Sequence, residues 1–130
     1  MPEYQIRLNY EPPSEPWFWV PLEVGPDIVL SVVFDPLFPV SLLSRSALRD
    51  IQSRARSYAL PVMKPIGERR YLLTGARIRD WDIPPFEVRE SALLGRLRLV
   101  FRADGVIGFD FFRTFENICL NVPSRVLTFS

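Results

Sequence analysis

A nearly continuous apolar run, Ile28–Phe34, is the feature that most constrains the fold, and it ends directly in a carboxylate, Asp35. An apolar run of this length, bounded by turn residues, predicts a strand that is buried on both faces. A carboxylate against apolar surroundings costs free energy unless it is paired, hydrogen-bonded or protonated. Asp35, with Pro36 after it, is therefore either a functional group or the first residue of a turn that its own side chain caps.

The length and composition indicate a single folded domain. We expect one domain over residues 1–130, in which 1–16 supply a strand and a proline-rich linker and 17–130 form the core. Apolar residues make up 48% of the chain, which argues against disorder over most of its length. The net charge of only +1 argues against nucleic-acid or membrane-surface binding driven by bulk electrostatics. No apolar run approaches the roughly 18 residues that span a bilayer, and residues 1–10 lack a signal-peptide pattern.

The chain contains no histidine and one cysteine, Cys119. Without histidine there is no Ser–His or Cys–His nucleophile pair, and the commonest zinc ligand is missing. Cys119 cannot form a disulfide within the chain, which is typical of a reducing compartment. We therefore expect a cytoplasmic protein that binds no metal and no cofactor.

Alternating and turn-bounded apolar segments predict a strand-rich fold with two short helices. Strands are expected at Tyr4–Tyr10, at Trp17–Val24 with Pro21 at an edge or bulge, in several short pieces between Ile66 and Val100, at Leu93–Phe101, and in a final hairpin of Asn117–Val122 and Arg125–Phe129. Ser44 or Ser46 can cap a helix over residues 45–56, and a second helix is expected near 109–116. This order favours an all-β, closed or folded-over sheet.

Two separated motifs resemble those of the retropepsin-like aspartic protease family. The segment Val32–Ser44 has the hydrophobic frame of the strand and turn that carry the catalytic Asp, and Gly105–Phe112 resembles the second family motif. The tail Cys119–Phe129 is similar to the closing hairpin of the bacterial members. The resemblance covers roughly residues 18 to 130. It implies a retropepsin-like, closed β-barrel with two short helices, in which a psi-shaped loop containing Val106, Ile107, Gly108 and Asp110 lies beneath the Asp35 turn.

The resemblance gives Asp35 the position of the catalytic residue, but the residues after it differ. In the family, two copies of the turn meet at a two-fold axis, and the two carboxylates share a proton and activate water. A Thr or Ser and then a Gly follow the Asp and hold the two turns together. Here Pro36 has neither a hydroxyl nor an N–H, and Leu37 adds a bulky side chain. Both changes affect the features that keep the carboxylates coplanar.

Three functions follow from this comparison. The chain is an inactive retropepsin-like domain that binds an extended peptide or assembles with a protein, an active homodimeric aspartic endopeptidase that uses Asp35 of each subunit, or a purely structural domain whose groove is filled by Leu37 and Phe38. A peptide would lie against the Asp35–Val40 turn, including Pro36, Leu37 and Phe38. A flap from within Met63–Leu73, with Gly67 near its tip, would cover it.

A homodimer is expected, because one chain supplies only half of a retropepsin-like groove. Tyr4–Tyr10 and Val126–Phe129 alternate in polarity and have ladder groups that need a partner. They either pair across a two-fold axis with a second copy, which is the prediction, or pair with each other inside one chain and leave a monomer.

Overall fold

A computed structural model describes residues 4–7, 18–79, 81–92 and 103–130 of the chain. The strands are β1 (Tyr4–Arg7), β2 (Phe18–Val24), β3 (Ile28–Phe34), β4 (Leu42–Ser44), β5 (Met63–Gly67), β6 (Arg70–Leu73), β7 (Ala76–Ile78), β8 (Trp81–Asp82), β9 (Phe86–Ser91), β10 (Gly105–Ile107), β11 (Ile118–Asn121) and β12 (Val126–Phe129). The helices are α1 (Arg45–Ala55) and α3 (Phe109–Phe112). The predicted strand Leu93–Phe101 lies outside the described residues.

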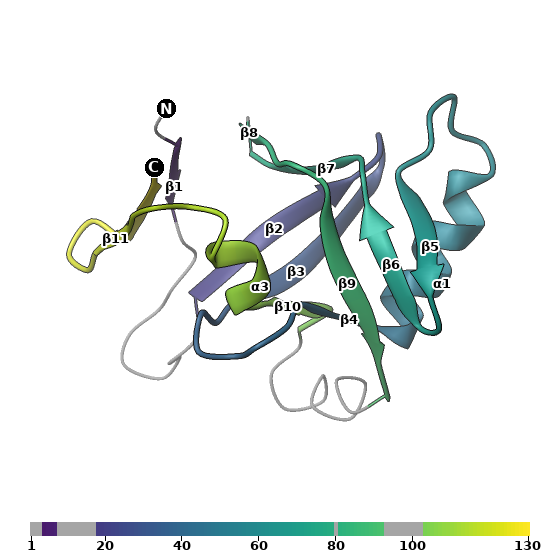
Figure 1. The fold of residues 1–130 in the computed structure, drawn as a ribbon. Helices are drawn as coiled ribbons and strands as arrows, with labels where there is room; N and C mark the ends of the chain where they lie inside the picture. The colour runs from purple at the N-terminus through teal and green to yellow at the C-terminus, as the bar shows by residue number, and fades with distance from the viewer. Residues whose placement is uncertain (1–3, 8–17, 80, 93–102) are drawn as a thin grey trace.

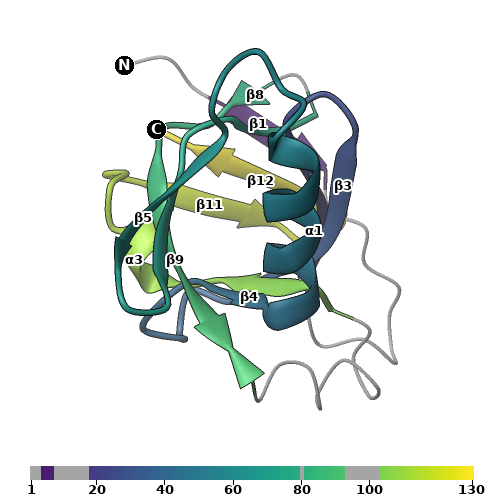
Figure 2. The same ribbon diagram turned by 90° about the vertical axis from the view of Figure 1, so that its right-hand side faces the viewer.

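The strands form two sheets. Nine strands, in the order β5-β6-β9-β4-β10-β3-β2-β7-β8, make a sheet that curls into a half-barrel (Figures 1 and 2). Within the described residues its end strands, β5 and β8, do not pair with each other, so the expected closure is not seen there. The chain ends form a separate sheet in the order β1-β12-β11. The predicted all-β architecture with two short helices is confirmed.

Strand β3 lies inside the large sheet, as its apolar sequence predicts. It pairs antiparallel with β2 along its whole length and parallel with β10 over Val32–Phe34. Its last three residues, Val32, Val33 and Phe34, are all buried, whereas Val29 and Ser31 are exposed. Only the second half of the strand is therefore buried on both faces, and this half leads into Asp35.

Strand β2 accommodates Pro21 because its second neighbour is short. Pro21 is paired with Ser31 of β3, and on the other side β7 reaches only Glu23 and Val24. A proline has no N–H to donate to a ladder, so it fits where one side of the strand has no ladder among the described residues. The predicted edge position of Pro21 is thus correct for this part of β2.

The two helices begin where the sequence predicts, and the second is short. Ser44 caps α1, its Oγ accepting a hydrogen bond from the Ala47 amide at 3.1 Å. Ala47, Leu48 and Ile51 are buried and attach α1 to the sheet, and Figure 2 shows the helix lying against it. Helix α3 ends at Phe112, four residues before the end expected from the sequence.

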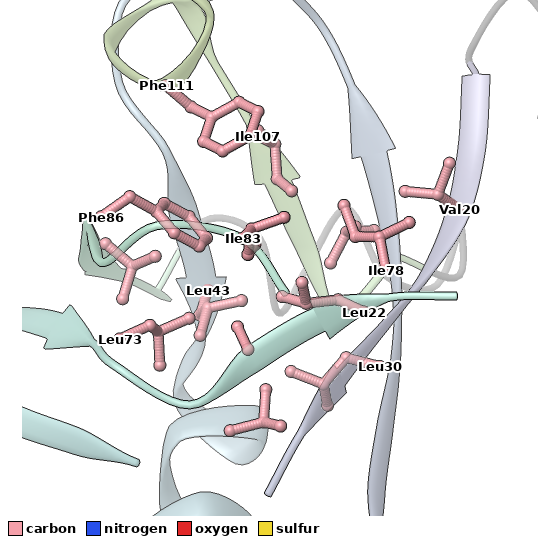
Figure 3. Close-up of a cluster of buried hydrophobic side chains, with 14 of the residues drawn as sticks. Val20, Leu22, Leu30, Leu43, Leu73, Ile78, Ile83, Phe86, Ile107 and Phe111 are labelled. Atoms are coloured by element: carbon pink, nitrogen blue, oxygen red, sulfur yellow. The ribbon is translucent and has the colours of Figure 1, made fainter. Parts of the chain in front are cut away.

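The core is continuous and rich in aromatic rings. Figure 3 shows side chains from β2, β3, β4, β6, β7, β9, β10 and α3 meeting in its interior. At one end of the core, Phe129 is fully buried, and its ring lies against five others, those of Phe34, Trp81, Phe111, Phe112 and Phe115. This aromatic cluster joins the small sheet to the large one.

The terminal strands pair inside one chain. Tyr4 is opposite Phe129 and Arg7 is opposite Val126 in an antiparallel β1–β12 ladder, and β11 occupies the other side of β12. Because β12 has a neighbour on each side, it has no edge to offer a second copy. The predicted pairing of these two strands across a two-fold axis is therefore wrong, and the homodimer itself stays a prediction.

Candidate functional site

The Asp35 side chain is held by its own turn. The Asp35 amide donates to the Ile107 carbonyl at 2.9 Å, which continues the β3–β10 ladder by one residue. Asp35 Oδ1 accepts a hydrogen bond from the Leu37 amide at 3.1 Å, and its carbonyl accepts one from the Phe38 amide at 3.1 Å. Pro36 presets the backbone of such a turn. The capping interpretation of Asp35 thus describes the local geometry, with the side chain partly exposed.

Gly108 lies directly beneath this turn. The Phe109 amide donates to the Phe38 carbonyl at 2.6 Å, so the backbones of the two segments touch. A Cβ on Gly108 would lie 2.3 Å from the Val40 carbonyl oxygen and 2.6 Å from that of Phe38. Only a residue without a side chain fits there. The two preceding residues, Val106 and Ile107, belong to β10 and pair with Val33 and Phe34.

A buried hydroxyl and a carboxylate fasten the end of the turn. Ser41 is completely buried, and its Oγ donates to Asp110 Oδ1 at 2.7 Å while accepting from the Gly108 amide at 3.0 Å. Asp110 Oδ2 accepts a hydrogen bond from the Ser41 amide at 3.1 Å. The sequence had placed Asp110 only in the psi-shaped loop that the resemblance implies, and it had given Ser41 no role. A serine inside an apolar run, three residues before the helix cap Ser44, was the available signal.

We expect Ser41→Ala to lower the free energy of unfolding by about 2 kcal/mol, because it leaves a buried amide and a carboxylate oxygen without their partner. Urea denaturation followed by tryptophan fluorescence measures the change. Ser53→Ala is the control, since Ser53 is exposed on α1 and its loss should change stability by less than about 0.5 kcal/mol. Combining Ser41→Ala with Asp110→Ala should lower the free energy of unfolding by less than the sum of the two single losses, because the two residues share one hydrogen-bond network. A loss equal to the full sum would contradict that network.

The side chains beside Asp35 face outward in the single chain. Leu37 is 94% exposed and Phe38 is 37% exposed, so neither fills a groove of its own molecule. Phe109, whose backbone contacts Phe38, is 52% exposed. We call these three residues the turn patch. It is an apolar surface around one carboxylate.

The predicted flap segment forms a hairpin that is part of the sheet. Gly67 ends β5, the turn is Glu68–Arg69, and β6 pairs with β9 from Arg70 onward. The Glu90 amide donates to the Arg69 carbonyl at 2.9 Å, and Glu90 is itself opposite Leu43 of β4. The register thus places the hairpin tip level with the middle of β4 and separated from β4 by β9, whereas the Asp35 turn precedes β4. The structure does not bring Gly67 to Asp35, and its flap role stays a prediction.

A pocket of about 590 Å³ lies at the opposite end of β3 from Asp35. It is bordered by the Gly25–Pro26 turn and by Tyr58, and the seven residues of β3 separate it from the Asp35 turn by roughly 20 Å. The Tyr58 hydroxyl donates a hydrogen bond to Asp27. Desolvation and this hydrogen bond raise the pKa of Tyr58 to about 12. The pocket is thus separate from the site at Asp35.

In the described ranges, His, Cys, Asp and Glu side chains form no group of three or more that could hold a metal ion. Neither helix in these ranges is long and apolar enough to cross a membrane.

The fold resembles solved structures of aspartic proteases. A retropepsin-like aspartic protease from Rickettsia conorii matches 98% of this chain and 89% of its own with a TM-score of 0.58 and 11% identity. The retroviral protease-like domain of Ddi1 from Leishmania major matches 86% of each chain with a TM-score of 0.50 and 16% identity. No protein-family model and no curated protein matches the sequence. These similarities show the fold alone.

Proposed function

We propose that this chain, whose fold is retropepsin-like, is a domain without Asp35-dependent peptidase activity that acts as a peptide-binding or assembly module. The observation that carries the proposal is the Asp35 turn. Its carboxylate is bonded to the Leu37 amide, and the residue between them, Pro36, offers neither a hydroxyl nor an N–H. The Leu37 side chain projects into solvent beside the carboxylate.

An aspartic dyad needs two nearly coplanar carboxylates that share one proton. A second Asp35 turn that approached this one would meet the exposed Leu37 side chain before the carboxylates came together. Catalytic groups tolerate only about half an ångström of displacement from productive geometry. A leucine that stands beside each carboxylate therefore favours binding over hydrolysis.

One observation favours the alternative, an active homodimeric aspartic endopeptidase. The Leu37 amide still donates to Asp35 Oδ1, so the backbone donor that the family takes from its glycine is present despite the change of side chain. The features that are lost are the hydroxyl and the N–H at Pro36 and the open space beside the carboxylate. Activity is thus a question of side chains at two positions, which an experiment can address directly.

We expect no Asp35-dependent cleavage of a mixed peptide library between about pH 3 and 7. Mass spectrometry of the products compares wild type with Asp35→Asn and with the double variant Pro36→Thr, Leu37→Gly. The double variant restores the hydroxyl and removes the obstructing side chain, so weak cleavage that appears only there would support the proposal. Robust wild-type cleavage that Asp35→Asn abolishes would instead establish the endopeptidase.

The proposal includes a homodimer and a cytoplasmic location. The turn patch is apolar and exposed, which is typical of a protein-binding surface. A single exposed thiol, Cys119, suits a reducing compartment.

An extended peptide would lie along the turn patch, and a protein partner would cover it. Light scattering with size separation at micromolar and lower concentrations tests the dimer, which a monomer of about 15 kDa throughout would exclude.

A further inference from the structure

We propose that β11 of one chain pairs edge to edge with β11 of a second copy, in an antiparallel ladder centred on Cys119. This inference rests on the homodimer of the proposed function and names the strand that forms it. The sequence had assigned that pairing to the two terminal strands, which the structure pairs with each other. Among the described residues this arrangement leaves the small sheet with two outer edges, those of β1 and β11. Strand β1 carries a charged residue, Arg7, whereas β11 carries none.

The backbone of β11 directs two residues outward. Asn117 and Ser130 exchange both hydrogen bonds, at 3.1 and 2.9 Å, so they form a hydrogen-bonded pair of the β11–β12 ladder. Such pairs alternate along an antiparallel ladder, so the backbones of Cys119 and Asn121 point toward β12. Those of Ile118 and Leu120 point the other way. Beyond β11 no further strand follows in this sheet among the described residues.

Two copies of this edge are complementary to each other. A two-fold axis through Cys119 places Ile118 of each copy opposite Leu120 of the other, which satisfies all four outward backbone groups on each strand. Cys119 is then directly opposite its counterpart in a non-hydrogen-bonded pair, with Cα atoms roughly 4.5 Å apart. That separation lies within the range that a disulfide can bridge.

Strand β11 lacks the features that protect other sheet edges. Proteins usually blunt an edge with charge, proline or a bulge. The edge strand β5 carries Lys64, Pro65 and a register shift, whereas β11 reads Ile-Cys-Leu-Asn with no charge and no proline. Leu120 is 37% exposed, and Val122 just after the strand is 65% exposed. An uncharged edge with apolar side chains, next to which no described strand lies, is suited to pairing with another strand.

The turn patch lies on the same side of the molecule. Figure 1 shows β11, α3 and the loop between β3 and β4 on the side opposite α1. The turn patch consists of only three apolar residues, and exposed apolar patches often mark a functional surface. A stable interface buries about 800 Å² on each partner, so the patch alone is too small. The β11–β12 hairpin supplies additional apolar surface on that side, and this points to a second copy of the chain as the occupant.

Cys119 reports directly on the pairing. Diamide takes up the two hydrogens that two thiols release as they form a disulfide, and we expect it to convert most of the wild-type protein to a covalent dimer at micromolar concentration. Cys119→Ser should give none. The matched control is Cys119→Ser with Ser53→Cys, which moves the thiol to an exposed position on α1 and should cross-link at least tenfold less.

A backbone change tests the ladder without the thiol. Leu120→Pro removes an outward N–H and leaves the bonds to β12 in place, so we expect the dimer dissociation constant to rise at least tenfold. Leu120→Ala keeps the N–H and should raise it by a clearly smaller factor. Light scattering measures both, and circular dichroism checks their folding. A dimer that neither cross-links at Cys119 nor weakens in Leu120→Pro would overturn the β11 pairing but leave the homodimer in place. A wild-type protein that is monomeric at all concentrations would contradict both the β11 pairing and the homodimer.

Discussion

Gly108→Ala is expected to lower the free energy of unfolding by roughly 3 kcal/mol, because overpacking typically costs about 1–3 kcal/mol and the neighbours here are rigid backbone atoms. The added methyl would meet two backbone carbonyl oxygens, those of Val40 and Phe38, at 2.3 and 2.6 Å. Neither oxygen can rotate away as a side chain could. The φ of Gly108 is −105°, a value that alanine adopts readily, so the cost is steric. The clash between the added methyl group and these oxygens is removed only if the Asp35 turn moves away from α3.

Chemical denaturation of Gly108→Ala and Gly67→Ala provides the comparison. Gly67 is exposed, and a Cβ there would approach only the Arg70 side chain, at 3.5 Å. Its substitution should change stability by less than about 0.5 kcal/mol. Since typical domains are stable by only 5–15 kcal/mol, Gly108→Ala could also appear as loss of soluble protein. Equally small losses of stability in Gly108→Ala and Gly67→Ala would show that the Asp35 turn and the start of α3 are not in contact as described.

Phe129→Ala is expected to cost about 3–5 kcal/mol, the range for deleting a large buried aromatic side chain. Phe129 is fully buried, and its ring is within 6.3 Å of five other aromatic ring centroids. The neighbouring rings come from β3, β8 and the α3 region, so they cannot all move in to fill the space. The change should therefore loosen the small sheet from the large one.

Thermal and urea unfolding measure this loss, with Phe109→Ala as the matched control. Phe109 is the same residue type but 52% exposed, so its removal should cost less than about 1.5 kcal/mol by the area it buries. Both variants should be compared at a concentration where they share one oligomeric state, since Phe109 belongs to the turn patch. A loss at Phe129 no larger than at Phe109 would show that the aromatic cluster does not hold the two sheets together.

Local patterns predicted much of this fold. The run Ile28–Phe34 was apolar because half of it is buried on both faces, and Ser44 was recognisable because a helix cap depends on residues close in sequence. The all-β architecture followed from such segments taken in order. Gly108 could be placed beneath Asp35 only through the resemblance to a family, because no local pattern states which distant backbone a glycine approaches.

Features that depend on distant partners could not be predicted in the same way. Ser41 and Asp110 are far apart in the sequence, and either could have been satisfied by a local cap. The ladder groups of β1 and β12 are equally well satisfied by their own chain or by a second copy, so alternation alone could not choose. The outward direction of Leu37 follows from the turn conformation, which its residue type does not determine.

The pairing of β1 with β12 also bears on the order in which the chain folds. These strands come from opposite ends of the chain, so joining them closes a loop of nearly its entire length. Loop-closure entropy grows with length, and contacts of high sequence separation form slowly. The β2–β3 hairpin, closed by a turn of three residues, carries no such cost. The nascent chain can thus build its large sheet early, whereas the strand that seats Phe129 in the aromatic cluster docks late.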